Sequence, residues 1–202
     1  MEQPDLKLQQ AVLAAAQQAY AEKLFAGTSG NLSVYDRERG ILYITPTSAR
    51  YETMRAQDIV AMRLDGTVLT PPLRPSSEWQ MHAIVYAARP DVQAQVHTHS
   101  PYATAFSVVR RPIPATLIEA LVFLGGEIPC AGYARPGTAQ VGELAAKALA
   151  SGLGGCLLDN HGVLAVGADL AQALLRAEYI EDTARITALA SGLGTPYVLT
   201  EL

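Results

Sequence analysis

Cysteine, basic charge and long apolar runs are all scarce in this chain of 202 residues. The two cysteines, Cys130 and Cys156, are too few for a disulfide framework, and we expect both to be buried free thiols. No apolar run approaches the ~18–20 residues that span a bilayer. Residues 1–5 show no basic segment followed by an apolar stretch, so no secretory signal is expected. These absences favour a cytoplasmic protein that does not bind a membrane.

The charge balance argues against a nucleic-acid partner. Lysine and arginine number 15 against 19 aspartate and glutamate residues, the formal net charge is −4, and the basic residues are scattered. A protein that binds phosphate backbones needs a basic face. The sequence also lacks linker-like tracts, low-complexity segments and repeats, while 50% of its residues are hydrophobic. We therefore expect one well-buried domain over residues 1–202.

Hydrophobic spacing predicts interleaved helices and strands. Apolar residues at helical spacing indicate helices over 6–25, 102–109, 139–149 and 170–190, and a further one that opens at Ser76 or Ser77. Strands are predicted over 31–35, 41–45, 59–64, 67–69, 92–98, 155–158 and 163–166. Hairpin signals at 36–40 and at Asp65-Gly66 disfavour a purely parallel sheet. The expected fold is therefore a layered α/β domain with a central mixed sheet.

Three of the four histidines lie where one metal ion would need them. His97 and His99 alternate along a predicted strand, so their side chains leave the same face. His161 follows another apolar run and precedes Gly162. Two separately satisfied core histidines are the alternative, but a shared metal would satisfy both rings at once. Three imidazoles are typical of a catalytic zinc site with an open position, and the ligand type favours zinc over iron or manganese.

Glu78 is the best candidate for acid/base chemistry. It lies at the predicted start of a helix, where a carboxylate is electrostatically favoured. The alternative is an ordinary capping role, because Ser77-Glu78-Trp79-Gln80 fits a capping box. His82 follows four residues later on the same helical face, and we interpret it as a half-buried histidine or a partner behind the ligands rather than as a ligand.

Three hydroxyl-rich segments could converge on one phosphate group. These are residues 28–31, 45–48 and 76–77, each at the predicted end of a helix or strand. Short loops of glycine, serine, threonine and asparagine bind oxyanions through backbone amides, and a helix N-terminus favours anions. Each segment alone more often only turns the chain, so the convergence itself is the prediction.

Six motifs occur together in one order along the chain: Gly27-Thr28-Ser29-Gly30-Asn31, Ile44-Thr45-Pro46-Thr47, Pro75-Ser76-Ser77-Glu78-Trp79, His97-Thr98-His99, Ile128-Pro129-Cys130-Ala131 with Tyr133 and Gly137-Thr138, and His161-Gly162. From about Leu6 to the C-terminus the chain resembles the class II aldolase/adducin family. The resemblance implies a three-layer α/β/α domain that assembles as a cyclic homotetramer, with active sites between subunits.

The resemblance also implies an activity and the residues that perform it. The expected reaction is the reversible cleavage of L-fuculose 1-phosphate to dihydroxyacetone phosphate and L-lactaldehyde. By this likeness one Zn²⁺ per subunit is bound by His97, His99 and His161, and Glu78 is the catalytic acid/base. The positions that hold the substrate phosphate correspond to Gly30, Asn31, Thr47, Ser48, Ser76 and Ser77.

Three departures from the family pattern concern the phosphate loop and the proton donor to the aldehyde. Ser48 stands where the family aldolase usually has glycine, and the tyrosine expected near Leu117 is absent. The chain also ends at Leu202 without the longer tail that carries a further tyrosine. Tyr133 or Tyr197 could substitute as donor.

Two other kinds of function remain open from the sequence. A sugar-phosphate 4-epimerase or an oxo-acid sugar-phosphate decarboxylase would use the same metal with another substrate, although related epimerases tend to have aspartate where this chain has Glu78. A non-catalytic adducin-like binding module would share the fold. Such a module has no reason to keep three converging histidines beside a glutamate.

Overall fold

A six-stranded sheet forms the centre of the computed structural model, which describes residues 3–201. The strands are β1 (Asn31–Asp36), β2 (Ile41–Ile44), β3 (Val60–Met62), β4 (Ala94–Thr98), β5 (Gly155–Leu158) and β6 (Gly162–Gly167). Their order is β3-β2-β1-β4-β6-β5, so β1 and β4 are central neighbours. Met1 and Glu2, within the segment where no secretory signal was expected, lie outside the described residues.

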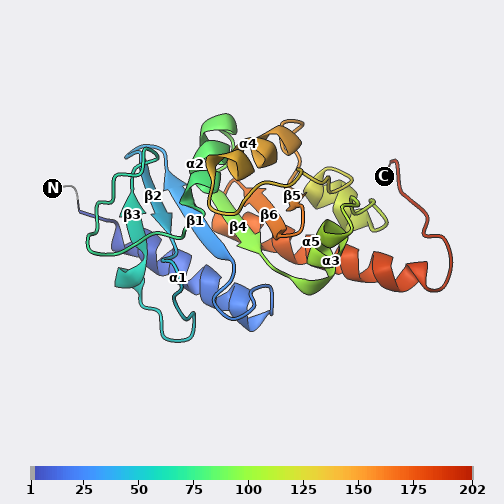
Figure 1. The fold of residues 1–202 in the computed structure, drawn as a ribbon, viewed down its shortest axis with the longest axis horizontal. Helices are drawn as coiled ribbons and strands as arrows, with labels where there is room; N and C mark the ends of the chain where they lie inside the picture. The colour runs from blue at the N-terminus through green and yellow to red at the C-terminus, as the bar shows by residue number, and fades with distance from the viewer. Residues whose placement is uncertain (1–2, 202) are drawn as a thin grey trace.

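Helices cover both faces of this sheet (Figure 1). On one face lie α1 (Leu6–Ala21), α3 (Pro101–Val108), α5 (Leu170–Ser191) and the π-helix η2 (Ala120–Leu124). On the other lie α2 (Trp79–Ala88) and α4 (Ala139–Ala148), and the short 3-10 helix η1 (Ala56–Asp58) precedes β3. The three-layer α/β/α architecture expected from the sequence is therefore confirmed.

Alternation along the strands divides the interior into two cores. In β6, Val163 and Ala165 face α5, whereas Leu164 and Val166 face α2 and α4. Successive side chains of a strand leave opposite faces, so a strand buried on both sides is apolar throughout. Burial at about 25 cal/mol per Å² of apolar area is the main stabilising contribution.

The sheet is antiparallel rather than mixed. Each neighbouring pair among the six strands runs antiparallel, and the one parallel contact found in residues 3–201 is an isolated bridge between Cys130 and Leu157. The prediction of a mixed sheet was wrong. The helical connections join strands that are not adjacent in the sheet, so they create no parallel pair of neighbouring strands. Alternating helices and strands in a sequence do not determine strand direction.

Several predicted elements are shorter than expected, among them the first helix and the strand after Asp65-Gly66. The first helix ends at Ala21 instead of Phe25, because Lys23 adopts a left-handed φ of 64° that a helix cannot continue through. The turn at Asp65-Gly66 forms as predicted, with the Gly66 amide donating to the Arg63 carbonyl. Its second arm contributes only a bridge between Met62 and Val68. Pro71 and Pro72 follow, and proline cannot donate to a ladder.

No helix within residues 3–201 combines the length and apolar character required to cross a membrane. Both cysteines are free, Cys156 buried and Cys130 partly buried.

Candidate active site

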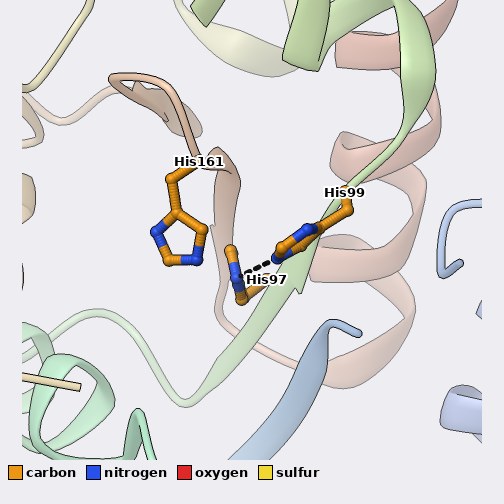
Figure 2. Close-up of side chains that lie close together, drawn as sticks. All are labelled: His97, His99 and His161. Atoms are coloured by element: carbon orange, nitrogen blue, oxygen red, sulfur yellow. Dashed lines mark hydrogen bonds between the residues drawn. The ribbon is translucent and has the colours of Figure 1, made fainter. Parts of the chain in front are cut away.

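His97, His99 and His161 form a cluster where β4 ends and its antiparallel neighbour β6 begins (Figure 2). His97 is the fourth residue of β4, His99 lies just beyond that strand, and His161 precedes β6. One nitrogen from each ring lies within 4.8 Å of the others, and the Nε2 atoms of His97 and His99 are 3.0 Å apart. The structure brings together the three histidines selected from the sequence.

The donor atoms of this cluster suit a metal ion. Nδ1 of His97 lies 2.8 Å from the Val163 carbonyl oxygen, which can only accept, so Nδ1 carries the proton. In the neutral ring Nε2 then presents its lone pair to the cluster. A hydrogen bond at the far nitrogen is the usual way in which a protein fixes the tautomer of a metal-binding histidine.

Burial keeps two of the three rings neutral. It lowers the pKa of His99 and of His161 to about 4, with the neighbouring His97 acting in the same direction. Burial also disfavours charge on His97, but the adjacent Glu78 carboxylate outweighs burial and raises its pKa. Neutral imidazoles are the form that binds metal, and a divalent cation would replace the proton shared by His97 and Glu78.

Glu78 lies directly against the histidine cluster. Its Oε2 is 3.0 Å from Nε2 of His97, and its Oε1 is 3.2 Å from Nε2 of His161. Oε1 is buried and accepts no hydrogen bond from any residue that the structure describes. Burial would raise the pKa of this carboxyl, but the two imidazoles and the Asn31 amide lower it below its ordinary value. A charged, incompletely satisfied oxygen thus faces the cluster.

The predicted capping box at Ser77 is wrong. Helix α2 begins at Trp79, Glu78 occupies the N-cap position, and its side chain makes no cap hydrogen bond within residues 3–201. The Ser76 hydroxyl instead accepts the Glu78 amide at 3.2 Å. Because the carboxylate is not used to cap the helix, it is free to face the histidines.

Behind Glu78 lies a chain of buried polar side chains, of which the sequence indicated only His82, as one of two interpretations. Nδ2 of Asn31 donates to Glu78 Oε2 at 2.9 Å, and Oδ1 of Asn31 lies 2.5 Å from Nε2 of His82. Nδ1 of His82 lies 2.7 Å from the Ser33 hydroxyl, which is 2.8 Å from the Tyr86 hydroxyl. His82 is fully buried, so the half-buried interpretation is wrong, and its contact with Asn31 fits the other interpretation, a partner behind the ligands. The i, i+4, i+8 spacing of Glu78, His82 and Tyr86 was the available signal.

The three hydroxyl-rich segments meet at one cavity of about 270 Å³. Its walls include all six residues predicted to hold phosphate, together with Glu78, His99 and His161. His97 lies beneath the cavity, cross-strand from Asn31. The predicted phosphate residues and the histidine cluster therefore share one space.

Backbone geometry holds the first of these segments against β4, the strand that carries His97. Gly30 has a φ of 78°, and a Cβ there would lie 2.9 Å from the His97 carbonyl oxygen and 2.5 Å from the Phe25 ring. Only glycine fits such an approach. Ser48 has a φ of 55°, the left-handed conformation that glycine adopts readily, which explains why the family pattern has glycine there.

The two tyrosines considered as proton donors are both exposed, Tyr133 by 57% and Tyr197 by 92%. Within residues 3–201, neither they nor Leu117 line the cavity. A larger groove of about 440 Å³ lies between α3, α5 and the C-terminal segment, but its lining is mainly apolar and contains no histidine. Size alone does not identify the active site in this molecule.

Known proteins resemble this chain in both sequence and fold. The sequence-family model of the class II aldolase and adducin N-terminal domain matches residues 10–188 of this chain. A 5-deoxy-D-ribulose 1-phosphate aldolase of Bacillus thuringiensis serovar kurstaki is 36% identical, covering 91% of this chain and 87% of its own. An L-ribulose-5-phosphate 4-epimerase of Salmonella paratyphi B is 34% identical, with 93% and 86% covered. A solved L-fuculose 1-phosphate aldolase superposes with a TM-score of 0.93 at 36% identity, covering 98% and 92%.

The chain belongs to the class II aldolase and adducin family. Within that family it is a metal-dependent aldehyde-lyase, an aldolase of class II.

Proposed function

We propose that this enzyme cleaves a ketose 1-phosphate between C3 and C4, releasing dihydroxyacetone phosphate and an aldehyde. The observation that carries the proposal is the Glu78 carboxylate, 3.0 Å from His97 and 3.2 Å from His161, in the wall of a cavity that also contains the hydroxyl-rich segments. In this proposal His97, His99 and His161 hold one zinc ion, and Glu78 is the acid/base.

Breaking the C3–C4 bond leaves an electron pair on C3, conjugated with the C2 carbonyl. Zinc, when bound, supplies a Lewis acid that stabilises the resulting enediolate charge, a contribution of several kcal/mol. The C4 hydroxyl loses its proton as C4 becomes the aldehyde carbon, and C3 gains one, so no net proton is consumed. In this proposal Glu78 takes up a proton and delivers it to C3 in cleavage, and it removes the C3 proton in synthesis, a role that requires the carboxylate within hydrogen-bond reach. The hydroxyl-rich segments bind the phosphate and so orient C3 toward Glu78.

Phosphate binding in this proposal relies on neutral donors, because the six predicted residues carry hydroxyl, amide and backbone N–H groups. Replacing Ser77 with alanine removes one such donor and should raise KM for the sugar phosphate about tenfold or more, with a smaller effect on kcat. Steady-state kinetics with the phosphorylated ketose checks this. An unchanged KM would remove Ser77 from the phosphate site.

L-fuculose 1-phosphate, which yields L-lactaldehyde, is the first substrate proposed. The solved fuculose phosphate aldolase with a TM-score of 0.93 supports it. A second candidate is 5-deoxyribulose 1-phosphate, which would yield acetaldehyde, because the relative with that name matches 91% of this chain. Both ketoses end in a methyl group, so we propose a terminally deoxygenated ketose 1-phosphate as the substrate class.

A substrate panel tests this proposal. Zinc-loaded enzyme is incubated with L-fuculose 1-phosphate, 5-deoxyribulose 1-phosphate and L-ribulose 5-phosphate, with and without chelator. We expect release of dihydroxyacetone phosphate from a ketose 1-phosphate, lost with chelator and in Glu78→Gln. Epimer formation from L-ribulose 5-phosphate without triose release would instead support the epimerase activity that the Salmonella relative's name describes. An oxo-acid sugar phosphate is added to the panel as a further substrate, and release of carbon dioxide from it would indicate a decarboxylase.

The homotetramer, the cytoplasmic location and a role in fucose degradation also belong to this proposal. The exposed apolar side chains Ile118, Val122 and Phe123 on and near η2 support an assembly that covers them. Light scattering of the purified protein checks the assembly, and a monomer with full activity would contradict it. Absence of any activity and of bound metal, even after zinc reconstitution, would favour the adducin-like binding module.

A further inference from the structure

In the buried chain of polar side chains behind Glu78, the identities of the contacting atoms determine which group donates each hydrogen bond. The Asn31 amide contacts a carboxylate on one side and an imidazole on the other, at 2.9 Å and 2.5 Å. A carboxylate only accepts, so the NH₂ group of Asn31 must face Glu78 and its carbonyl oxygen must face His82. A carbonyl oxygen also only accepts, so Nε2 of His82 must carry a proton.

The other half of the chain follows from this assignment. Burial holds His82 in its neutral form by lowering its pKa to about 3, so only one ring nitrogen is protonated. Nδ1 therefore accepts the proton of the Ser33 hydroxyl, 2.7 Å away, and the Tyr86 hydroxyl lies 2.8 Å beyond. The His82 carbonyl oxygen is held separately by Nε2 of Gln95 at 2.9 Å. Both ring nitrogens are thus engaged, and the ring cannot rotate without breaking two hydrogen bonds.

His82 makes no contact with the cavity that would let it touch a substrate. It is 0% exposed and is absent from the cavity walls defined by residues 3–201. On one side the ring reaches, through the Asn31 amide, the carboxylate that faces the histidine cluster.

We propose that His82 is a positioning residue for the reaction. As the neutral Nε2–H tautomer it fixes the orientation of the Asn31 amide, and Asn31 in turn holds Oε2 of Glu78. Without the His82 donor, the amide is free to turn its oxygen toward the carboxylate, where two acceptors repel. Glu78 would then leave its position while the three histidines stay in place. This inference rests on the proposed acid/base role of Glu78.

Two variants separate positioning from packing. His82→Leu removes both hydrogen bonds at similar volume, whereas His82→Gln keeps an N–H donor near the position of Nε2. Substituting a residue that orients an active-site group by hydrogen bonding, without touching the substrate, typically lowers activity about 10–100-fold. We expect His82→Leu to lower kcat for ketose 1-phosphate cleavage about 10–100-fold with KM within about twofold and zinc content unchanged. His82→Gln should recover most of this loss.

Val85→Ala is the matched control. Val85 is fully buried on the same helix but packs in the apolar core, so its truncation destabilises α2 without touching the polar chain. Its kcat should stay within about twofold of wild type. A folded, zinc-loaded His82→Leu enzyme with wild-type kcat, or a His82→Gln enzyme no better than His82→Leu, would overturn the proposal.

A second measurement needs neither substrate nor a folded His82→Leu protein. Imidazole ¹⁵N chemical shifts of the zinc-loaded wild-type chain report the tautomer of each ring, and the His82 signals are those lost in His82→Gln. We expect neutral His82 with the proton on Nε2 between pH 6 and 8. A proton on Nδ1, or on both nitrogens, would overturn the proposal. This result stands even if the enzyme cleaves none of the ketose phosphates, so the two proposals can fail separately.

Discussion

The two faces of the central strands β1 and β4 are equally buried but differ in chemistry. Toward α1 and α5 the buried side chains are apolar: Leu32, Ala94 and Val96. Toward α2 they are polar, at most 3% exposed: Asn31, Ser33, Gln95 and His97. The same two strands thus contribute hydrophobic burial on one side and a hydrogen-bonded site on the other.

This difference teaches that the part of the α2 face formed by β1 and β4 is arranged for chemistry and not for stability, whereas the neighbouring strands on that face keep an apolar core. Burying a polar group costs free energy unless a hydrogen bond replaces its hydration. Apolar residues of similar volume would serve the fold at least as well. The apolar face supports the polar one, because burial of apolar side chains supplies stabilising free energy that burial of polar groups does not. Substitutions on the two faces should therefore have opposite signatures.

The largest effect is expected from His97→Ala. The substitution removes one imidazole ring from the histidine cluster, and the Val163 carbonyl oxygen loses the hydrogen bond from Nδ1 of His97. We expect zinc content to fall well below one per subunit and aldol cleavage to fall about 10⁴-fold or more, because the Lewis acid is lost. Elemental analysis and triose release measure this. A variant that keeps a full complement of zinc would show that His97 is not a ligand.

Glu78→Gln should separate metal binding from proton transfer. The amide keeps the size of the side chain but cannot carry the proton, so cleavage should fall about 10³-fold while zinc is retained. Exchange of the C3 proton of dihydroxyacetone phosphate with deuterated solvent, followed by NMR, tests the step itself. Exchange at the wild-type rate would assign the acid/base role to another group.

Acidification should destabilise the polar face selectively. His82, His99 and His161 have pKa values lowered to about 3, 4 and 4, so between about pH 6.5 and 4 the unfolded chain binds protons that the folded chain does not. The free energy of unfolding of zinc-free protein should therefore fall, by roughly 3 kcal/mol from pH 7 to 4.5 after allowance for solvent screening.

Two other groups modify this pH dependence. Glu78, whose pKa is also lowered, loses its contribution as pH falls further, which adds to the decrease. The raised pKa of His97 acts in the opposite direction, since its protonation stabilises the folded state below pH 6.5. Urea unfolding of the chelator-treated protein at pH 7 and at pH 4.5 measures the net change in the free energy of unfolding. Constant or rising stability on acidification would contradict the inferred neutral histidines.

Most of the histidine cluster could be predicted from local patterns. His97 and His99 at i and i+2 and His161 at the end of an apolar run are short-range features, and they meet as expected. The convergence of the hydroxyl-rich segments was predicted as a possibility, and the cavity contains all three. Glu78 was predicted as the acid/base from its place at the start of a helix and from the family resemblance, and the alternative capping role is wrong.

The buried chain behind Glu78 could not be predicted, because it depends on strand order. Asn31 and Ser33 meet His82 and Tyr86 only because β1 lies beside β4 and α2 crosses the face of β1. Periodicity determines which side of an element is buried, but not which element covers it. Antiparallel pairing throughout the sheet escaped prediction for the same reason.

The smallest effect on activity is expected from a substitution on the apolar face. The residue concerned is the neighbour of His97, whose substitution has the largest expected effect. Val96→Ala lies one position from His97 but points toward the opposite core. It should lower the free energy of unfolding by about 2 kcal/mol through lost burial and the cavity left behind. Because β4 keeps its pairing with β1 and β6, zinc content and kcat should remain within about twofold of wild type. Thermal unfolding beside steady-state kinetics makes the comparison, and a large loss of activity in stable, folded Val96→Ala would show that the two faces are coupled.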